Sequence, residues 1–204
     1  MNCAAVNSTV VVLAQNVETA LTVVARSVMP TENSFWVYYL SHTEPTYLEE
    51  AGNGQQAQRD KSLKYVKSWR NALDIGANVG EWARPLAKRF DKVICFEPNP
   101  NFRDCFKRNF VVGDTEPRDG DIECRSLDSF GFTEVDYIKI DVDGFEVPVL
   151  RGAEQTLRKN NPVINIEMKE RKRPITVRKC RKLLHRYGYS FVSRVRSDEV
   201  WLKQ

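Results

Sequence analysis

Short apolar runs alternate with helical patterns from about residue 70 to the C-terminus. The apolar runs are bounded by turn-forming residues, as buried strands are, and lie at residues 72–75, 93–96, 135–140 and 163–166. Between them, apolar residues recur at steps of three or four and predict helices at residues 82–90, 101–109, 147–157 and 169–186. This repeated order predicts an α/β fold with a mostly parallel sheet. Two further runs, at residues 189–194 and 200–203, predict a terminal antiparallel strand pair.

The first part of the chain is less regular. Apolar residues from Asn7 to Met29 recur at helical steps and predict an amphipathic helix, although the β-branched run from Thr9 to Val12 also suits a strand. A strand is predicted at residues 35–40 and a helix at residues 61–69. A segment before the first core strand often lies across a pocket mouth. The candidate contacts there, which also suit a solvated loop, are Gln55, Gln56, Arg59 and Asp60.

Two regions are expected from this pattern. Residues 1–65 should form a helical or irregular extension that packs on the core, and residues 66–204 should form the α/β domain. The apolar stretch near the N-terminus lacks the positive start and the unbroken apolar core of a secretory signal, and it is too interrupted for a transmembrane helix. No transmembrane segment is therefore predicted.

A glycine-punctuated turn follows the first predicted strand of the domain, directly after Asp74 and Ile75. In α/β proteins, a turn of this kind between a strand and a helix binds a nucleotide. Gly76 can adopt backbone angles closed to residues with a Cβ, and Gly80 allows a helix to pack closely on the strand. A dinucleotide site would have a glycine in place of Asn78. A cofactor with one nucleoside and no pyrophosphate fits better, and S-adenosylmethionine is the common one.

An acid ends the second predicted strand, where a ribose diol is held in nucleotide-binding α/β proteins. This acid is Glu97, about 23 residues after Asp74. The bent turn and the carboxylate are thus predicted to meet in one crevice. The predicted cofactor contacts are Asp74, Gly76, Ala77, Asn78, Gly80, Glu97, Pro98 and Asp141.

With these motifs in order, the chain from about Ala72 to the C-terminus resembles the FkbM family of S-adenosylmethionine-dependent methyltransferases. The matching runs are LDIGANVGEWARPLAKRF, VICFEPNP, SLDSF, VDYIKIDVDGFEVPVLRGA and INIEMKE. The resemblance implies a Rossmann-like class I methyltransferase fold and O-methylation of sugars, glycans or related metabolites. Family members usually carry a longer segment at residues 110–128, which contacts the adenine. Asp119 and Asp121 could serve the adenine here, or they could be solvated turn residues.

Two more acids end predicted strands at the same rim of the sheet. Asp141 follows one strand and Glu167 ends the next, and ligands of open α/β sheets bind beyond such strand ends. We expect Asp141 to position cofactor or acceptor and Glu167 to contact the acceptor. The general base stays unassigned among Asp141, Asp143, Glu146 and Glu167. His185 belongs to a basic helix away from the strand ends, and His42 lies in the irregular N-terminal part.

Composition changes this picture little. The chain is 42% hydrophobic and 28% charged, as a globular protein is, and its net charge is +4. This mild charge permits an anionic substrate but does not indicate nucleic acid. The basic helix at 169–186 suits a solvated face, or else a docking surface for an anionic carrier or nucleic acid. The five cysteines form no CxxC pair, so no metal site or disulfide framework is predicted, and a cytoplasmic location is expected.

Three other functions compete with small-molecule or glycan methylation. A nucleic-acid methyltransferase that modifies amino groups would carry an Asn/Asp-Pro-Pro-aromatic motif after the fourth strand, where this chain has Asp141 to Phe145. A non-catalytic cofactor-binding or interaction module would suit the short segment at 110–128. An NAD-dependent enzyme is disfavoured by Asn78. The sequence does not determine the oligomeric state.

Overall fold

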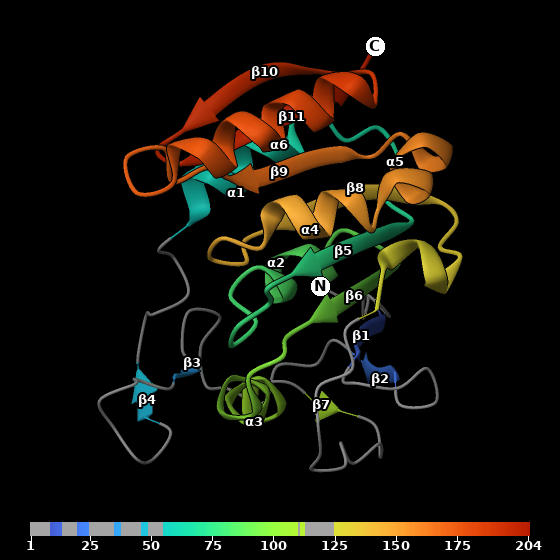
Figure 1. The fold of residues 1–204 in the computed structure, drawn as a ribbon. Helices are drawn as coiled ribbons and strands as arrows, with labels where there is room; N and C mark the ends of the chain where they lie inside the picture. Colours follow the sequence, from blue (N-terminus) through green and yellow to red (C-terminus); the bar gives the residue numbers. More distant parts are fainter. Residues whose placement is uncertain are drawn as a thin grey trace. The chain divides into compact units, whose positions relative to one another are not determined.

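The computed structural model describes residues 55–109, 111–112 and 125–204, and four short strands in the first part of the chain. The chain divides into two compact units (Figure 1). Unit 1 comprises residues 1–55 and 76–122, and unit 2 comprises residues 56–75 and 123–204. The predicted boundary after residue 65 stays a prediction.

Unit 2 contains three of the four strands that the apolar runs predict. In spatial order the strands are β10 (Tyr189–Val195), β11 (Asp198–Lys203), β9 (Val163–Glu167), β8 (Val135–Ile140) and β5 (Asn71–Ile75). Strand β8 pairs in parallel with β5 and with β9, whereas β11 is antiparallel to both β9 and β10. The mostly parallel sheet with an antiparallel C-terminal pair is therefore confirmed.

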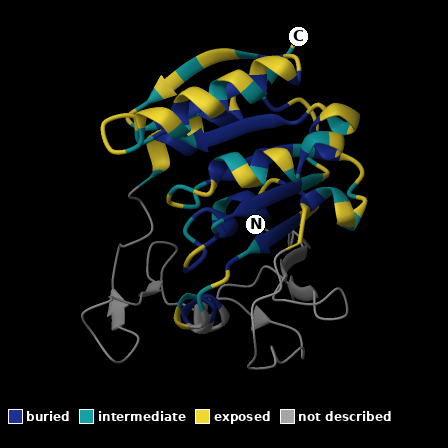
Figure 2. Ribbon diagram, in the orientation of Figure 1, coloured by how far each residue is buried: buried dark blue, intermediate teal, exposed yellow. Residues whose placement is uncertain are grey.

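Helices cover both faces of this sheet (Figure 1). Helix α1 (Gln56–Leu63) contacts β9 and β10 on one face; on the other lie α4 (Glu146–Arg151), α5 (Glu154–Asn160) and α6 (Pro174–Arg186). A short 3-10 helix, η2 (Leu127–Phe130), contacts α5. Strands β5, β8 and β9 are mostly buried, whereas the edge strand β10 and the outer helix faces are largely exposed (Figure 2). The long predicted helix at 147–157 is in fact two helices, because Gly152 and Ala153 interrupt it.

The helix predicted at residues 61–69 is wrong in its bounds. Helix α1 begins at Gln56 and ends at Leu63. Beyond it the chain turns toward β5, and Arg70 fixes this turn because its backbone N–H and its guanidinium both donate to the Asp136 carboxylate. The pattern of polar and apolar residues did not predict this contact between Arg70 and Asp136.

Unit 1 contains β6 (Lys92–Phe96), which pairs in parallel with β1 (Thr9–Leu13). Strand β1 is antiparallel to β2 (Ala20–Val24), which pairs with β7 (Val111–Val112); β3 (Phe35–Val37) and β4 (Thr46–Leu48) form a separate pair. Helix α2 (Ala83–Ala87) contacts β6, and α3 (Pro100–Asn109) contacts β3.

The amphipathic helix predicted from Asn7 to Met29 is wrong, because strands β1 and β2 lie within that range. The valine run at the start of β1 explains this, since β-branched residues favour strands and β6 offers a neighbouring strand to pair with. The strand predicted at 35–40 is confirmed in part by β3. Asp119 and Asp121 lie outside the described residues, as do His42, 110 and 113–124.

No helix in the described part of the chain is long and apolar enough to cross a membrane. The expected cytoplasmic location stays a prediction.

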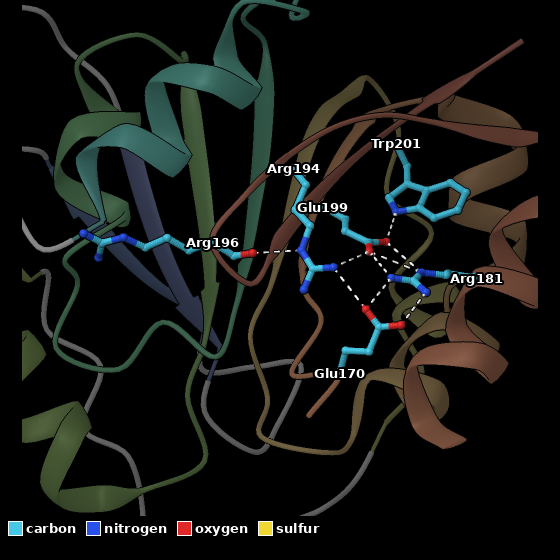
Figure 3. Close-up of polar contacts among 6 residues, drawn as sticks. All are labelled: Glu170, Arg181, Arg194, Arg196, Glu199 and Trp201. Carbon is cyan, nitrogen blue, oxygen red and sulfur yellow. Dashed lines mark hydrogen bonds and ion pairs between the residues drawn. The ribbon is translucent and has the colours of Figure 1, made fainter. Parts of the chain in front are cut away.

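An ion-pair cluster around the buried Glu199 joins β11 to α6 (Figure 3). Glu199 has only 1% of its side chain exposed, and it accepts hydrogen bonds from Arg181 and from the indole of Trp201. Arg181 also binds Glu170, which in turn pairs with Arg194. One arginine thus neutralises the buried acid, while the second lies at the exposed side of the cluster.

We expect Arg181→Gln to lower the free energy of unfolding by about 2 kcal/mol, because it removes the close partner of a buried charge. Arg194→Gln should cost less than about 1 kcal/mol, since its nearest carboxylate, on Glu170, is exposed. Urea denaturation of both variants measures the two losses. Equal losses would contradict the central place of Arg181.

Candidate active site

The predicted glycine turn, residues 76–80, lies in unit 1 and is called the glycine loop below. Its backbone is bent as expected: φ is 83° at Gly76, 51° at Asn78 and 93° at Gly80. The N–H groups of Gly76 and Ala77 donate to the Phe96 carbonyl oxygen over 2.9 and 3.0 Å. These bonds hold the loop against the end of β6.

Glu97 meets the glycine loop. Its Oε2 accepts a hydrogen bond from the Asn78 N–H over 2.8 Å, and its Oε1 accepts one from the Asn99 N–H, also over 2.8 Å. The carboxylate is thereby fixed beside the exposed tip of the loop, although Glu97 itself is only 7% exposed. The next residue, Pro98, is exposed, and its carbonyl accepts a hydrogen bond from Arg103. The structure therefore brings together the bent turn and the acid that the sequence pairs.

Unit 2 carries a row of polar side chains on the α1 side of its sheet. A hydrogen bond between the hydroxyl groups of Ser62 of α1 and Tyr137 of β8, 2.8 Å long, identifies that side. Because side chains alternate along a strand, Lys139 and Asp141 follow Tyr137 on the same side. The strand registers place further members beside them. We call the following set the polar face: Asp74, Lys139, Asp141, Asn165, Glu167 and Asp198.

Asp74 and Lys139 form a buried ion pair at the inner end of the polar face. Lys139 Nζ lies 3.3 Å from Asp74 Oδ1 and 4.0 Å from Asp141 Oδ2. Burial lowers the pKa of Lys139, but attraction by Asp74 and Asp141 outweighs it and the net pKa is raised, so the ammonium is retained. Asp74 is 0% exposed, so its carboxylate is held inside unit 2 beside Lys139.

Glu167 lies at the open end of the polar face, with 12% of its side chain exposed. Burial raises its pKa to about 7, and a hydrogen bond shared with Asp141 acts in the same direction. Lys169 Nζ lies 2.8 Å from Glu167 Oε2 and opposes this shift, while Ser197 donates to Oε1 over 3.3 Å. The structure thus brings Asp141 and Glu167 together, as the strand ends predict.

Three members of the polar face were missed by sequence analysis. These are Lys139, Asn165 and Asp198, which are 4%, 1% and 6% exposed. Asn165 Nδ2 donates to Asp198 Oδ1 over 3.2 Å. Lys139 and Asn165 stand inside otherwise apolar strand runs, a signal that could have found them. Asp198 follows a turn and has no such signal.

The remaining candidates are placed differently. Asp143 is exposed and pairs with Lys169 over 2.6 Å and with Arg173 over 3.4 Å. Glu146 is buried and accepts the Gly144 N–H, so it closes the turn before α4. His185 is exposed and its ring lies edge-on to Trp201.

The predicted contacts before β5 are divided between the two units. Gln55, in unit 1, donates its N–H to Glu81 over 3.2 Å, and its side-chain oxygen accepts the Trp82 indole N–H. Arg59 is buried in α1, whereas Gln56 and Asp60 are exposed.

The sequence of this chain matches a known domain family. Residues 117–191 match the model of the methyltransferase FkbM domain. The matched part of the chain is therefore similar to an FkbM-type methyltransferase domain. S-adenosylmethionine, the predicted cofactor, is the methyl donor of this class. No curated protein matches the chain significantly.

Solved structures of methyltransferases share the fold. A precorrin-6y C5,15-methyltransferase from Geobacter metallireducens is 13% identical, with a TM-score of 0.54 over 83% of this chain and 94% of that one. A precorrin 8w decarboxylase from Methanobacterium thermoautotrophicum is 16% identical, with a TM-score of 0.54 over 87% and 100%. These similarities confirm the class I methyltransferase fold.

A structure of an FkbM methyltransferase, from Methylobacillus flagellatus, is also similar. It is 17% identical, with a TM-score of 0.50 over 69% of this chain. This chain spans 47% of that protein's length.

Proposed function

We propose that this FkbM-type enzyme transfers the methyl group of S-adenosylmethionine to a hydroxyl group of a sugar, a glycan or another small metabolite. The observation that carries the proposal is the Asp141–Glu167 pair, which offers a carboxylate base at the ends of neighbouring strands. A hydroxyl is a poor nucleophile until its proton is removed, so such a base suits O-methylation.

The residues of the glycine loop fit the predicted cofactor. The loop has the glycine-dependent bend that a nucleoside site requires, and Glu97 is fixed at its tip by the Asn78 N–H. We assign the ribose diol to Glu97 and the neighbouring backbone to the rest of the adenosyl group, with Gly76, Ala77, Gly80 and Pro98 as the surrounding contacts. When bound, the cofactor supplies a methyl group that its sulfonium has already activated.

The acids of unit 2 would act on the acceptor. We assign the hydroxyl proton to Glu167 and the orientation of the acceptor to Asp141. A carboxyl with a pKa near 7 can take up a proton at neutral pH, and Lys169 keeps the Glu167 carboxylate oriented. Asp74 is a positioning residue in this scheme, because it is fully buried against Lys139.

Calorimetry with S-adenosylmethionine and S-adenosylhomocysteine tests the cofactor half of the proposal. We expect both to bind, and Glu97→Gln to weaken binding by roughly tenfold, since the amide replaces one charged acceptor with a donor that faces the Asn78 N–H. Asp91→Asn, an exposed acid of unit 1, is the matched control and should bind like wild type.

Two outcomes would redirect the proposal. No binding of either ligand would favour a non-catalytic interaction module. Equal affinities of wild type and Glu97→Gln would remove Glu97 from the site. Methyl transfer to oligonucleotides but not to hydroxyl compounds would make the protein a nucleic-acid methyltransferase.

A further inference from the structure

We propose that Asp141, Asn165, Glu167 and Asp198 bind an ammonium group of the methyl acceptor, which makes the acceptor an amino sugar or another hydroxyl compound with a primary amine. We call these four residues the acid cluster. The inference rests on the proposed methyl transfer, because it names the substrate class of the same site.

Strand register brings the acid cluster together. Glu167 of β9 lies opposite Asp198 of β11, and Asn165 joins the two strands through its hydrogen bond to Asp198. Asp141 directly follows Ile140 of β8, which lies opposite Ile166 of β9, so strand register places Asp141 next to Glu167. Asp141 keeps 23% of its side chain exposed and Glu167 keeps 12%, so a ligand can reach the cluster from the open end of the polar face.

Negative charge exceeds positive charge on the polar face. Lys139 is its one cation, and it lies closer to Asp74 than to Asp141. Lys169 approaches Glu167 but also pairs with Asp143. Burial, reinforced by the negative charge of Asp141, raises the pKa of Asp198 to about 6. An additional cation beside Asp198 would lower this pKa again.

Asn165 supplies an independent sign that a donor belongs in the cluster. Its Oδ1 has no hydrogen-bond donor among the described residues, although the residue is 1% exposed. Because Nδ2 of the same planar amide is held on Asp198, this oxygen lies beside the acid cluster. A buried acceptor without a donor is costly. An ammonium group brings three donors and a positive charge, and so satisfies both the amide oxygen and the carboxylates.

A metal ion fits these residues less well than an ammonium group. In the part of the chain that the structure describes, no group of three or more His, Cys, Asp or Glu could hold a metal ion. The cluster offers an amide oxygen among carboxylates at hydrogen-bonding distances, which suits N–H donors.

Binding of an ammonium should release protons near neutral pH. A cation favours the ionised forms of Glu167 and Asp198, and so lowers the pKa of each. The charged groups facing Glu167 are Asp141 and Lys169; those facing Asp198 are Asp141 and Lys139. Calorimetry in two buffers of different ionisation enthalpy measures the released protons.

The test compares D-glucosamine with D-glucose, which lacks the amine, on protein saturated with S-adenosylhomocysteine at pH 7. We expect glucosamine to bind with proton release and at least roughly tenfold more tightly than glucose. Asp198→Asn should remove most of this difference, whereas Glu154→Gln, an exposed acid of α5, should preserve it. Circular dichroism confirms that both variants are folded, and Asn165→Leu repeats the test if Asp198→Asn is not.

Three results would overturn the inference and leave the proposed methyl transfer intact. The first is equal affinity for the two sugars, or no binding of glucosamine at high millimolar concentration. The second is binding without proton release. The third is competition between glucosamine and S-adenosylhomocysteine. That result would mean that the acid cluster binds the ammonium group of the cofactor and not that of the acceptor. Failure of S-adenosylhomocysteine itself to bind would instead contradict the proposed function.

Discussion

Glu167→Gln is expected to lower kcat for methyl transfer by at least about 100-fold, with little change in the affinity for S-adenosylmethionine. The amide keeps the shape of the side chain and can still accept the Ser197 hydrogen bond, but it cannot take up the acceptor's proton. Methyl transfer from labelled cofactor to hydroxyl acceptors, measured beside cofactor binding, separates loss of chemistry from loss of binding.

The pH dependence of methyl transfer also tests Glu167 as the base. Because Glu167 acts as a carboxylate, the wild-type kcat/KM, which reports the free protein, should rise with pH through about 7 and then level off. Glu167→Gln should lack this rise. Glu134→Gln, an exposed acid of unit 2, is the control and should keep both the rate and its pH profile. A variant of Glu167 with the full rate and profile would exclude this residue as the base.

Glu167 should also make the free energy of unfolding depend on pH. Its pKa in the folded state, about 7, lies above its ordinary value of 4.5, so the folded state binds more protons between these two values. The free energy of unfolding should therefore fall as pH rises through this window, and part of this fall should be absent in Glu167→Gln. Urea denaturation at pH 5 and pH 8 measures the difference.

Asp74→Ala is expected to lower the free energy of unfolding by about 3 to 5 kcal/mol, because it leaves the ammonium of Lys139 buried with only the more distant Asp141. The sequence alone predicted Asp74 as a cofactor contact. Its 0% exposure adds an expected role in stability, since its carboxylate is held inside unit 2 beside Lys139. Urea denaturation measures the loss.

Matched replacements sharpen this test. Asp74→Leu combined with Lys139→Met removes both charges and should cost less than Asp74→Ala alone. Arg158→Ala breaks the exposed pair with Glu154 and should cost less than about 0.5 kcal/mol. If Asp74→Ala costs no more than Arg158→Ala, the buried pair does not stabilise the fold.

Local sequence patterns determined the fold class and the glycine loop. The apolar runs at β5, β6, β8 and β9 predicted parallel strands because strand burial leaves a continuous apolar signal. Gly76 and Gly80 predicted a bent turn because glycine readily adopts the positive φ angles that such a turn requires. Glu97 was found because it directly follows the next predicted strand. Such features depend on neighbours along the chain, so one sequence suffices to find them.

Tertiary structure decided the rest. Strands β1 and β2 replaced a predicted helix because β6 offers them a partner that is distant in sequence. Register across β8, β9 and β11 brought Asp198 to Asn165 and Glu167, and register between β5 and β8 made Asp74 the buried partner of Lys139. Pairing between strands depends on contacts that local periodicity does not encode, and burial then sets the charge and pKa of each acid. The sequence by itself determined which acids stand at strand ends, whereas the folded chain decided which of them face one another.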